Sequence, residues 1–204
     1  MRRYPLPGDE ARLKSKLRSA LAGLDRKIVV LDDDPTGVQT VHNISVYTEW
    51  SEEAIQSGFL ESSPMFFILT NSRSLTAGDT AGLHRDIAIN LLKVASRLDK
   101  KFIIISRSDS TLRGHYPLET EVLRKTIEDN SSIRIDGEII MPFFREGGRF
   151  TINNIHYVQE GKYLIPAGKT EFARDKTFGY THSHLGKWIE EKSSGRYNAE
   201  KVKY

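Results

Sequence analysis

The chain has 204 residues, of which 38% are hydrophobic and 28% charged, a composition typical of one globular domain. Its 30 basic and 27 acidic residues leave a formal net charge of +3, so we expect no nucleic-acid partner. Cysteine is absent, which excludes disulfides and thiolate metal sites, and no run reaches the ~18 apolar residues of a membrane span. Because the amino terminus also lacks the apolar core of a secretory signal, we expect a cytoplasmic protein without a membrane partner.

The first third of the chain predicts one helix and then strands that end in polar turns. Leucines at helical spacing predict a helix over residues 8–23. The apolar residues 27–31 predict a short buried strand, which continues into a carboxylate-rich turn, Asp32-Asp33-Asp34-Pro35-Thr36-Gly37. Residues 43–48 predict a second strand. Residues 65–69 predict a third, and it also ends in polar residues, Thr70-Asn71-Ser72-Arg73-Ser74.

The middle of the chain repeats the order of strand, polar turn and helix. Apolar residues keep the helical period from 76 to 98, which predicts a long amphipathic helix. The apolar run 102–105 predicts the next strand, and it ends in the string Ser106-Arg107-Ser108-Asp109-Ser110-Thr111-Leu112-Arg113-Gly114. Pro117, a residue type favoured in a first helical turn, opens a predicted helix that ends near residue 128. Residues 138–143 predict one more strand.

The last third departs from this alternation. Residues 151–166 predict a β-hairpin around Glu160-Gly161-Lys162, and residues 181–193 predict a final helix. The alternation before it requires crossover connections between parallel strands. We therefore predict an α/β fold of three layers, with a mostly parallel sheet, helices on both of its faces and a small β-hairpin insertion.

Three of the predicted strands end in polar clusters. In a parallel sheet these clusters lie along one carboxyl edge, where open α/β sheets bind their ligands. An arginine there suits a carboxylate or phosphate, and an aspartate can take a proton from an attacking hydroxyl. Each cluster alone fits a helix cap or a turn equally well, and Asp34 in particular suits a turn before Pro35 and Gly37. For the three together, a binding site is the favoured interpretation.

Other patterns are weaker as sites. Gly168-Lys169-Thr170 is similar to the end of a phosphate-binding P-loop, but Tyr163 stands where that motif needs its first glycine. The segment Phe172-Ala173-Arg174-Asp175 fits a polar site and a salt-bridged loop equally well. No metal site is predicted for the histidines that lack an acidic or thiolate partner at suitable spacing, His156, His182 and His184.

Several strings resemble the amino-terminal domain of the four-carbon acid sugar kinases. They are Val30-Leu31-Asp32-Asp33-Asp34-Pro35-Thr36-Gly37, Asp109-Ser110-Thr111-Leu112-Arg113-Gly114, Pro142-Phe143-Phe144-Arg145-Glu146-Gly147-Gly148-Arg149 and Lys169-Thr170-Glu171-Phe172-Ala173-Arg174-Asp175. The resemblance runs from about residue 27 to 196, and the second string is highly specific. One departure bears on specificity, because Ser106 and Arg107 stand where many members have a lysine pair.

The resemblance implies an activity and a set of site residues. Members are understood as ATP-dependent kinases that phosphorylate a hydroxyl of a tetronic acid such as threonate, erythronate or their oxo forms. Asp32 and Asp33 would be the catalytic residues at that hydroxyl, one of them the base, and Arg73 and Arg113 would hold the acid. The implied substrate-binding set is Thr36, Gly37, Asn71, Ser72, Arg73, Asp109, Ser110, Thr111, Arg113, Gly114, Gly147, Arg149 and Thr170.

The resemblance also implies that the nucleotide-binding half lies outside this chain. We therefore expect residues 1–204 to be the acid-sugar-binding part of a longer kinase, truncated before that domain ends and inactive in isolation. ATP and Mg2+ would bind mainly outside the chain, and no cofactor is expected within it. The alternative is a stand-alone sugar-acid-binding or regulatory module without catalysis. The expected partners are a small-molecule sugar acid and the missing carboxyl-terminal nucleotide-binding domain, and a homo-oligomer is left open.

Overall fold

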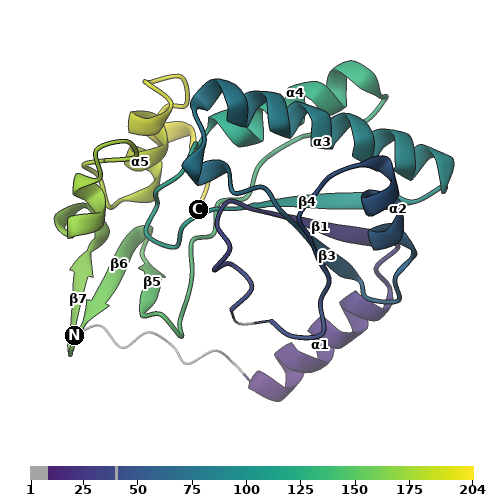
Figure 1. The fold of residues 1–204 in the computed structure, drawn as a ribbon. Coiled ribbons are helices and arrows are strands. Elements are labelled where there is room, and N and C mark those ends of the chain that lie inside the picture. Colours follow the sequence, from purple (N-terminus) through teal and green to yellow (C-terminus); the bar gives the residue numbers. More distant parts are fainter. Residues whose placement is uncertain (1–8, 40) are drawn as a thin grey trace.

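A parallel sheet organises most of the molecule (Figure 1). The structure is a computed structural model, and it describes residues 9–39 and 41–204. The sheet has the strand order β2-β3-β1-β4, and every neighbouring pair in it is parallel. Its strands are β1 (Arg26–Asp32), β2 (Val46–Tyr47), β3 (Met65–Leu69) and β4 (Lys101–Arg107).

The register of the parallel strands brings their carboxyl ends level with one another. In β1, Asp32 lies opposite Leu69 of β3 on one side and opposite Arg107 of β4 on the other. The strands form where the sequence has unbroken apolar runs, which suit central strands buried on both faces. The polar residues after β1, β3 and β4 therefore start from the same edge of the sheet.

Helices flank both faces of this sheet, and they cover one face more fully than the other. The long helix α3 lies side by side with α4 above the sheet in Figure 1, whereas α1 lies below it. The helices are α1 (Glu10–Ala22), α2 (Glu52–Leu60), α3 (Ala77–Arg97), α4 (Leu118–Asn130) and α5 (Leu185–Lys192). The α/β class, the mostly parallel sheet and its flanking helices confirm the predicted fold.

The main hydrophobic core lies between the sheet and α2, α3 and α4. Phe66 and Ile68 of β3 are fully buried there, and so are Ile87 and Leu91 of α3. The opposite face is more open, since Ile105 of β4 is 44% exposed and α1 has no buried residue. Among the described residues, no helix combines the length and apolarity that crossing a membrane requires.

A second, smaller core surrounds an antiparallel sheet with the order β5-β6-β7. Its strands are β5 (Arg149–Ile152), β6 (Ile155–Glu160) and β7 (Tyr163–Pro166). Gly161 turns the predicted hairpin between β6 and β7, with a φ of 58°. The hairpin is confirmed, and β5 extends it to three strands. Helix α5 buries Trp188 and Ile189, which packs the predicted last helix into this core.

Two strand predictions were wrong in extent or kind. Residues 138–143 form no strand, because the apolar run meets no neighbouring strand: Ile139 is 91% exposed and Met141 is 81% exposed. The predicted strand over 43–48 shortens to Val46–Tyr47, since Asn43 has a left-handed φ of 57°.

Helix α2 was not predicted. Its amino terminus carries a recognisable cap, in which the Ser51 side chain accepts a hydrogen bond from the Ala54 amide.

Candidate functional site

The carboxyl ends of β1, β3 and β4 are tied together by backbone hydrogen bonds. The Thr70 amide donates to the Asp32 carbonyl at 2.9 Å, and the Asp33 amide donates to the Arg107 carbonyl at 3.2 Å. These bonds continue the pairing of the sheet past its last regular residues. As a result, three polar segments far apart in sequence start within hydrogen-bonding distance of one another, as the sequence predicted for a parallel sheet.

Asp33 forms the most complete ion pair of this edge. Both of its carboxylate oxygens accept from Arg73, Oδ2 from Nε at 3.0 Å and Oδ1 from Nη2 at 2.8 Å. The same guanidinium lies 3.5 Å from Asp34 and 3.9 Å from Asp109. Burial raises the pKa of Asp33, and the hydrogen bonds from Arg73 oppose that rise. Arg73 is thus surrounded by carboxylates from two of the polar segments.

Asp32 is more deeply buried and less well paired. Its side chain is 1% exposed, and Oδ1 accepts one hydrogen bond, from Arg107 Nη1 at 3.2 Å. Burial raises the pKa of Asp32 to about 6, although the charge of Arg107 acts in the opposite direction. Gly37 lies directly over this carboxylate, because a Cβ at that position would be 1.9 Å from Asp32 Oδ2. The turn that follows β1 therefore covers Asp32.

Asp109 anchors the loop after β4. Its Oδ2 accepts from Arg113 Nε at 2.7 Å and also from the Thr111 hydroxyl. Burial alone would raise the pKa of Asp109, but these hydrogen bonds outweigh it and hold the pKa below its ordinary value. The smaller core fixes the same loop, since Tyr180 donates to the Thr111 carbonyl at 2.6 Å and His156 Nε2 contacts the Ser110 carbonyl at 2.7 Å.

Arg113 is enclosed by further partners from the smaller core. Its Nη1 lies 3.6 Å from Asp175 Oδ2, and its guanidinium carbon lies 5.2 Å from the centre of the Phe172 ring. Arg149 lies over the same ring, at 5.5 Å. Phe172 is therefore flanked by two cations, a favourable arrangement for an aromatic face.

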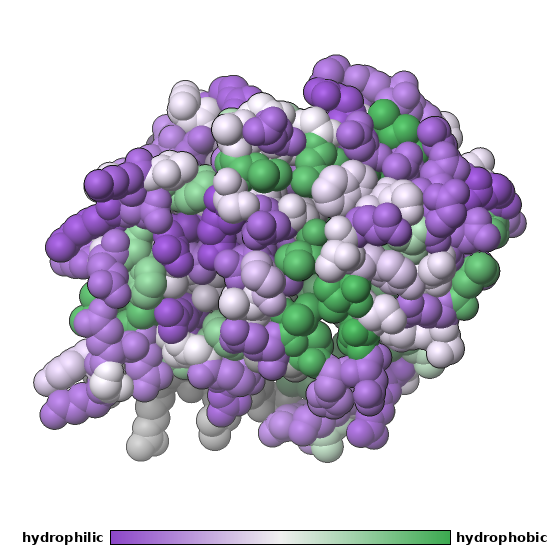
Figure 2. Space-filling view, viewed as in Figure 1, coloured by the Kyte–Doolittle hydropathy of each residue, from purple (hydrophilic) through white to green (hydrophobic). Residues whose placement is uncertain are grey.

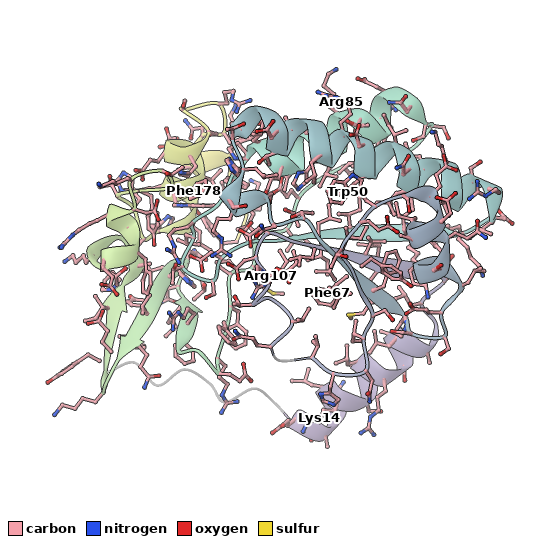
Figure 3. All side chains as sticks on the ribbon, in the orientation of Figure 1. Lys14, Trp50, Phe67, Arg85, Arg107 and Phe178 are labelled. Carbon is pink, nitrogen blue, oxygen red and sulfur yellow. The ribbon has the colours of Figure 1, made fainter. Side chains whose placement is uncertain are left out.

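A cavity of about 390 Å3 opens beside these charged groups. Five residues of the predicted set line it: Thr36, Gly37, Asp109, Ser110 and Arg113. Its other walls are largely apolar and include Val41, Phe67, Ile105, Ile140, Met141, Phe143 and Trp188. Figure 2 shows apolar side chains gathered near the middle of this view, and Figure 3 places Phe67 and Arg107 in that same central part. The cavity walls thus combine charged and apolar side chains.

A larger and more open depression, of about 520 Å3, lies elsewhere, between Trp50 and Asn90 of α3. None of the polar residues after β1, β3 and β4 lines it, and its walls hold no arginine. We therefore take the smaller cavity as the candidate site, because the charged groups converge there.

None of the predicted residues after β3 lines the cavity, Arg73 included, and neither do Asp32 and Asp33 after β1. Ser72 is fully buried, and its hydroxyl donates to Glu119 Oε1 at 2.7 Å. Asn71 is exposed and adopts a left-handed φ of 51° at the start of a short 3-10 helix. Both residues shape the segment that presents Arg73, and neither lines the cavity.

The remaining predicted residues also take supporting positions. Thr111 is 1% exposed, and Gly114 has a φ of 137° that favours glycine, next to Ser108 and Asp33. The Gly147 carbonyl accepts a hydrogen bond from Arg149. Thr170 is 3% exposed, and its hydroxyl donates to the Ala167 carbonyl at 2.7 Å. These residues border the site without lining the cavity.

Sequence reasoning missed three residues that the structure brings to this edge. Arg107 stood in the polar string after the predicted strand and at the departure from the family pattern, but it was not assigned to the site, yet it ends β4 and lines the cavity. Glu119 is 2% exposed and joins Ser72 to the cavity wall. Asp175 pairs with Arg113 and caps its own turn by accepting from the Phe178 amide at 2.9 Å. The position of Arg107 at a strand end was the one signal available for it.

Comparison with known proteins gives one matching family, and two solved structures illustrate the shared fold. The family described as "sugar-binding N-terminal domain" matches residues 28–204. A domain of unknown function, DUF1537, from Bordetella bronchiseptica has 23% sequence identity and a TM-score of 0.55. The match covers 79% of this chain and 39% of that one, which was solved with bound citrate as a domain-swapped dimer.

The second structure is a proposed tRNA synthase of Salmonella typhimurium LT2, with 16% identity and a TM-score of 0.55. The match covers 81% of this chain and 38% of that one. At these identities both likenesses speak for the fold. Comparison with curated proteins gives no match. The present chain therefore spans well under half the length of the two solved chains that share its fold.

Proposed function

The chain belongs to the family of sugar-binding N-terminal domains, which confirms the family predicted from its motifs, and we propose that it binds the acid for a sugar-acid kinase. In this proposal it is the substrate-binding portion of an ATP-dependent enzyme that phosphorylates a hydroxyl of a four-carbon sugar acid of the threonate, erythronate or oxo-tetronate type. The rest of that enzyme lies outside these residues.

One observation carries the proposal: the polar ends of three parallel strands meet, and the residues that follow two of them, β1 and β4, line the adjoining cavity. Arg107 and Arg113 line it with their guanidinium groups, which suit a carboxylate. Serine and threonine side chains on the same walls suit the hydroxyls of a sugar. The citrate bound by the Bordetella neighbour supports an acid as the ligand.

The geometry favours Asp32 over Asp33 as the base. Both oxygens of Asp33 are occupied by Arg73, whereas Asp32 has one side-chain donor, Arg107, besides a backbone hydrogen bond from Asp34. A pKa of about 6 suits a base near neutral pH, because the group is mostly ionised and still takes up a proton readily. Since Asp32 is 1% exposed, a substrate hydroxyl reaches it once the turn at Gly37 moves.

ATP and Mg2+ are the proposed cosubstrate and cofactor of the complete enzyme. Among the described residues, no three His, Asp or Glu side chains are grouped to hold a metal ion by themselves. The segment around Gly168 also differs from a phosphate-binding loop, since the Gly168 amide donates to the Ser183 hydroxyl at 2.9 Å. We therefore propose that both bind mainly outside this chain.

Calorimetry tests the proposal directly. The folded chain is titrated with threonate, erythronate and their oxo forms, and with the neutral polyols threitol and erythritol as controls. We expect at least one acid to bind and to raise the melting temperature, because a ligand that binds only the folded state stabilises it. The polyols should bind more weakly. Binding of none of the acids, or robust ATP turnover by these 204 residues alone, would contradict the proposal.

Self-association is a further part of the proposed assembly. The Bordetella neighbour is a domain-swapped dimer. In this chain, α1 leaves Leu13, Leu17 and Leu21 about half exposed, at 51%, 59% and 45%. These leucines lie four residues apart, so they form one stripe that a second copy could cover. Size-exclusion chromatography with light scattering should then give a dimer, and a monomer at all concentrations would oppose it.

A further inference from the structure

The three arginines at this edge of the sheet differ in how many carboxylates of the described residues lie within 4 Å of them: three for Arg73, two for Arg113 and one for Arg107. Arg73 makes two hydrogen bonds to Asp33 and lies within 4 Å of two more carboxylates. Arg113 donates to Asp109 and Thr111, pairs with Asp175 and stacks on Phe172. A ligand carboxylate that approached either of them would meet a guanidinium whose charge is already balanced by two or more carboxylates. Both arginines therefore serve first to hold the loops together.

Arg107 is less neutralised, because Asp32 is the one carboxylate of the described residues within 4 Å of it. Among the described residues, its guanidinium donates one side-chain hydrogen bond, to Asp32 Oδ1 at 3.2 Å. An arginine carries five N–H donors, arranged so that two of them fit a carboxylate at once. The Arg107 side chain is 28% exposed and lines the cavity. Its remaining donors make no side-chain hydrogen bond with the described residues, so they are available to a ligand in the cavity.

The surroundings of Arg107 suit a sugar acid in particular. Ser106, Ser108 and Ser110 lie along the same segment and line the cavity with it. Their hydroxyls can donate to or accept from the hydroxyls of a sugar, whereas a guanidinium cannot accept. A carboxylate on Arg107 would therefore leave the rest of the acid among these serines.

From this contrast we propose that Arg107 is the residue that binds the carboxylate of the acid, and that it turns away from Asp32 to do so. The proposal rests on the proposed function, since it names the group that recognises the ligand. It also assigns specificity to the position where the sequence departs from the lysine pair of many relatives. Lysine would offer a point charge there, whereas arginine offers a planar fork.

A second consequence concerns Asp32. The charged groups that face it are Arg107 from β4 and, from its own segment, Asp33 and Asp34. The two aspartates favour the neutral form of Asp32, and Arg107 is the cation that opposes them. If the ligand draws Arg107 away, Asp32 binds a proton more tightly and becomes a stronger base. Acid binding and proton uptake at Asp32 are then coupled.

Isothermal titration of matched variants tests the carboxylate contact. The probe is the tightest of the four tetronic acids, with erythritol as the neutral comparison. We expect Arg107→Gln to weaken binding of the acid by about 10- to 100-fold, the range of a lost charged hydrogen bond. Arg107→Lys keeps the charge and should weaken it less. Arg85→Gln, on the exposed face of α3, should leave it unchanged (Figure 3).

The outcomes separate this inference from the proposed function. If no acid binds the wild-type chain, the proposed function itself fails. If the acid binds the wild type and both Arg107 variants equally well, the inference is overturned and the proposed function stands. Should Arg107→Gln fail to fold, Arg107→Lys decides alone: unchanged affinity would refute the planar carboxylate contact, and a several-fold loss would support it.

Proton uptake gives a readout that a purely structural arginine would not move. The titration is repeated near pH 7 in two buffers that differ in ionisation enthalpy. We expect the wild type to take up a measurable fraction of a proton when the acid binds, and Asp32→Asn to take up none. Equal uptake by the two proteins would overturn the coupling between Arg107 and Asp32.

Discussion

Two arginine–aspartate pairs lie side by side at the carboxyl edge of the sheet, and they are built differently. Asp33 and Arg73 share two hydrogen bonds, and further carboxylates surround the arginine. Asp32 and Arg107 share one longer contact next to a cavity. Both aspartates are almost fully buried, so burial does not explain the difference. What differs is how completely the carboxylate and the guanidinium of each pair are hydrogen-bonded to each other.

This difference separates a pair that holds the polar loops in place from a pair that is able to bind a ligand or take up a proton. A buried charge pair with complete hydrogen bonding loses much by exchanging a partner, so it holds its segments in place. An incompletely paired guanidinium can accept a ligand carboxylate at lower cost. The first pair therefore fixes the polar loops after β1 and β3, and the second is the better candidate for binding and proton transfer.

The largest effect is expected when the fully hydrogen-bonded pair, Asp33 and Arg73, is broken. Asp33→Asn keeps the size of the side chain and removes its charge, which leaves Arg73 with the more distant Asp34 and Asp109. We expect a loss of about 3 kcal/mol in the free energy of unfolding, because removing one partner strands a buried charge. Denaturant-induced unfolding followed by circular dichroism measures it.

An exposed ion pair serves as the control. Asp25 lies 2.7 Å from Lys101, and both side chains are more than 60% exposed. Solvent screens such a pair, so Asp25→Asn should leave the stability unchanged within error. If Asp33→Asn behaved like this control, the distinction between a structural and a functional pair would be wrong.

The second effect concerns pH and the incomplete pair. The pKa of Asp32 is raised to about 6, so the folded protein holds this proton more tightly than the unfolded chain does. The resulting stabilisation is full below the ordinary pKa of an aspartate and is lost as the pH rises through about 6. Between about pH 4.5 and pH 7 the wild type should lose about 2 kcal/mol relative to Asp32→Asn. Unfolding curves of both proteins across that range measure the difference, and parallel pH profiles would refute the raised pKa.

The sequence allowed much of this edge to be predicted because strand ends are local signals. An apolar run followed by polar residues locates the carboxyl end of a strand, and Asp32, Asp33 and Asp109 were all found in this way. The direction of a side chain after the strand is not local. Ser72 turns into the core because Glu119, 47 residues later, accepts its hydrogen bond. No pattern in residues 70–74 contains that information.

The same limit explains why the strand predicted over residues 138–143 does not form. Residues 138–143 have the apolar character of a buried strand, but pairing depends on a neighbour elsewhere in the chain, and the described structure provides none for them. Arg107 was passed over for the opposite reason. It satisfied the strand-end rule, and its importance appears only when the partners of Arg73 and Arg113 are compared with its own.

The smallest expected effect sharpens the comparison at the turn that covers Asp32. A Cβ on Gly37 would lie 1.9 and 2.1 Å from the two oxygens of Asp32, far inside contact distance. Asp32 is short, buried and bonded to Arg107, so it can move aside only by weakening that contact. Gly37→Ala should therefore cost about 1 kcal/mol of stability and also reduce acid binding. Gly82→Ala is the matched control, because no atom lies within 4 Å of its Cβ and alanine favours the interior of α3. That variant should be as stable as the wild type or more so, with unchanged binding. If Gly37→Ala had the same stability and affinity as Gly82→Ala, the turn would not hold Asp32 in place. The turn would then not explain why Asp32 is paired less completely than Asp33.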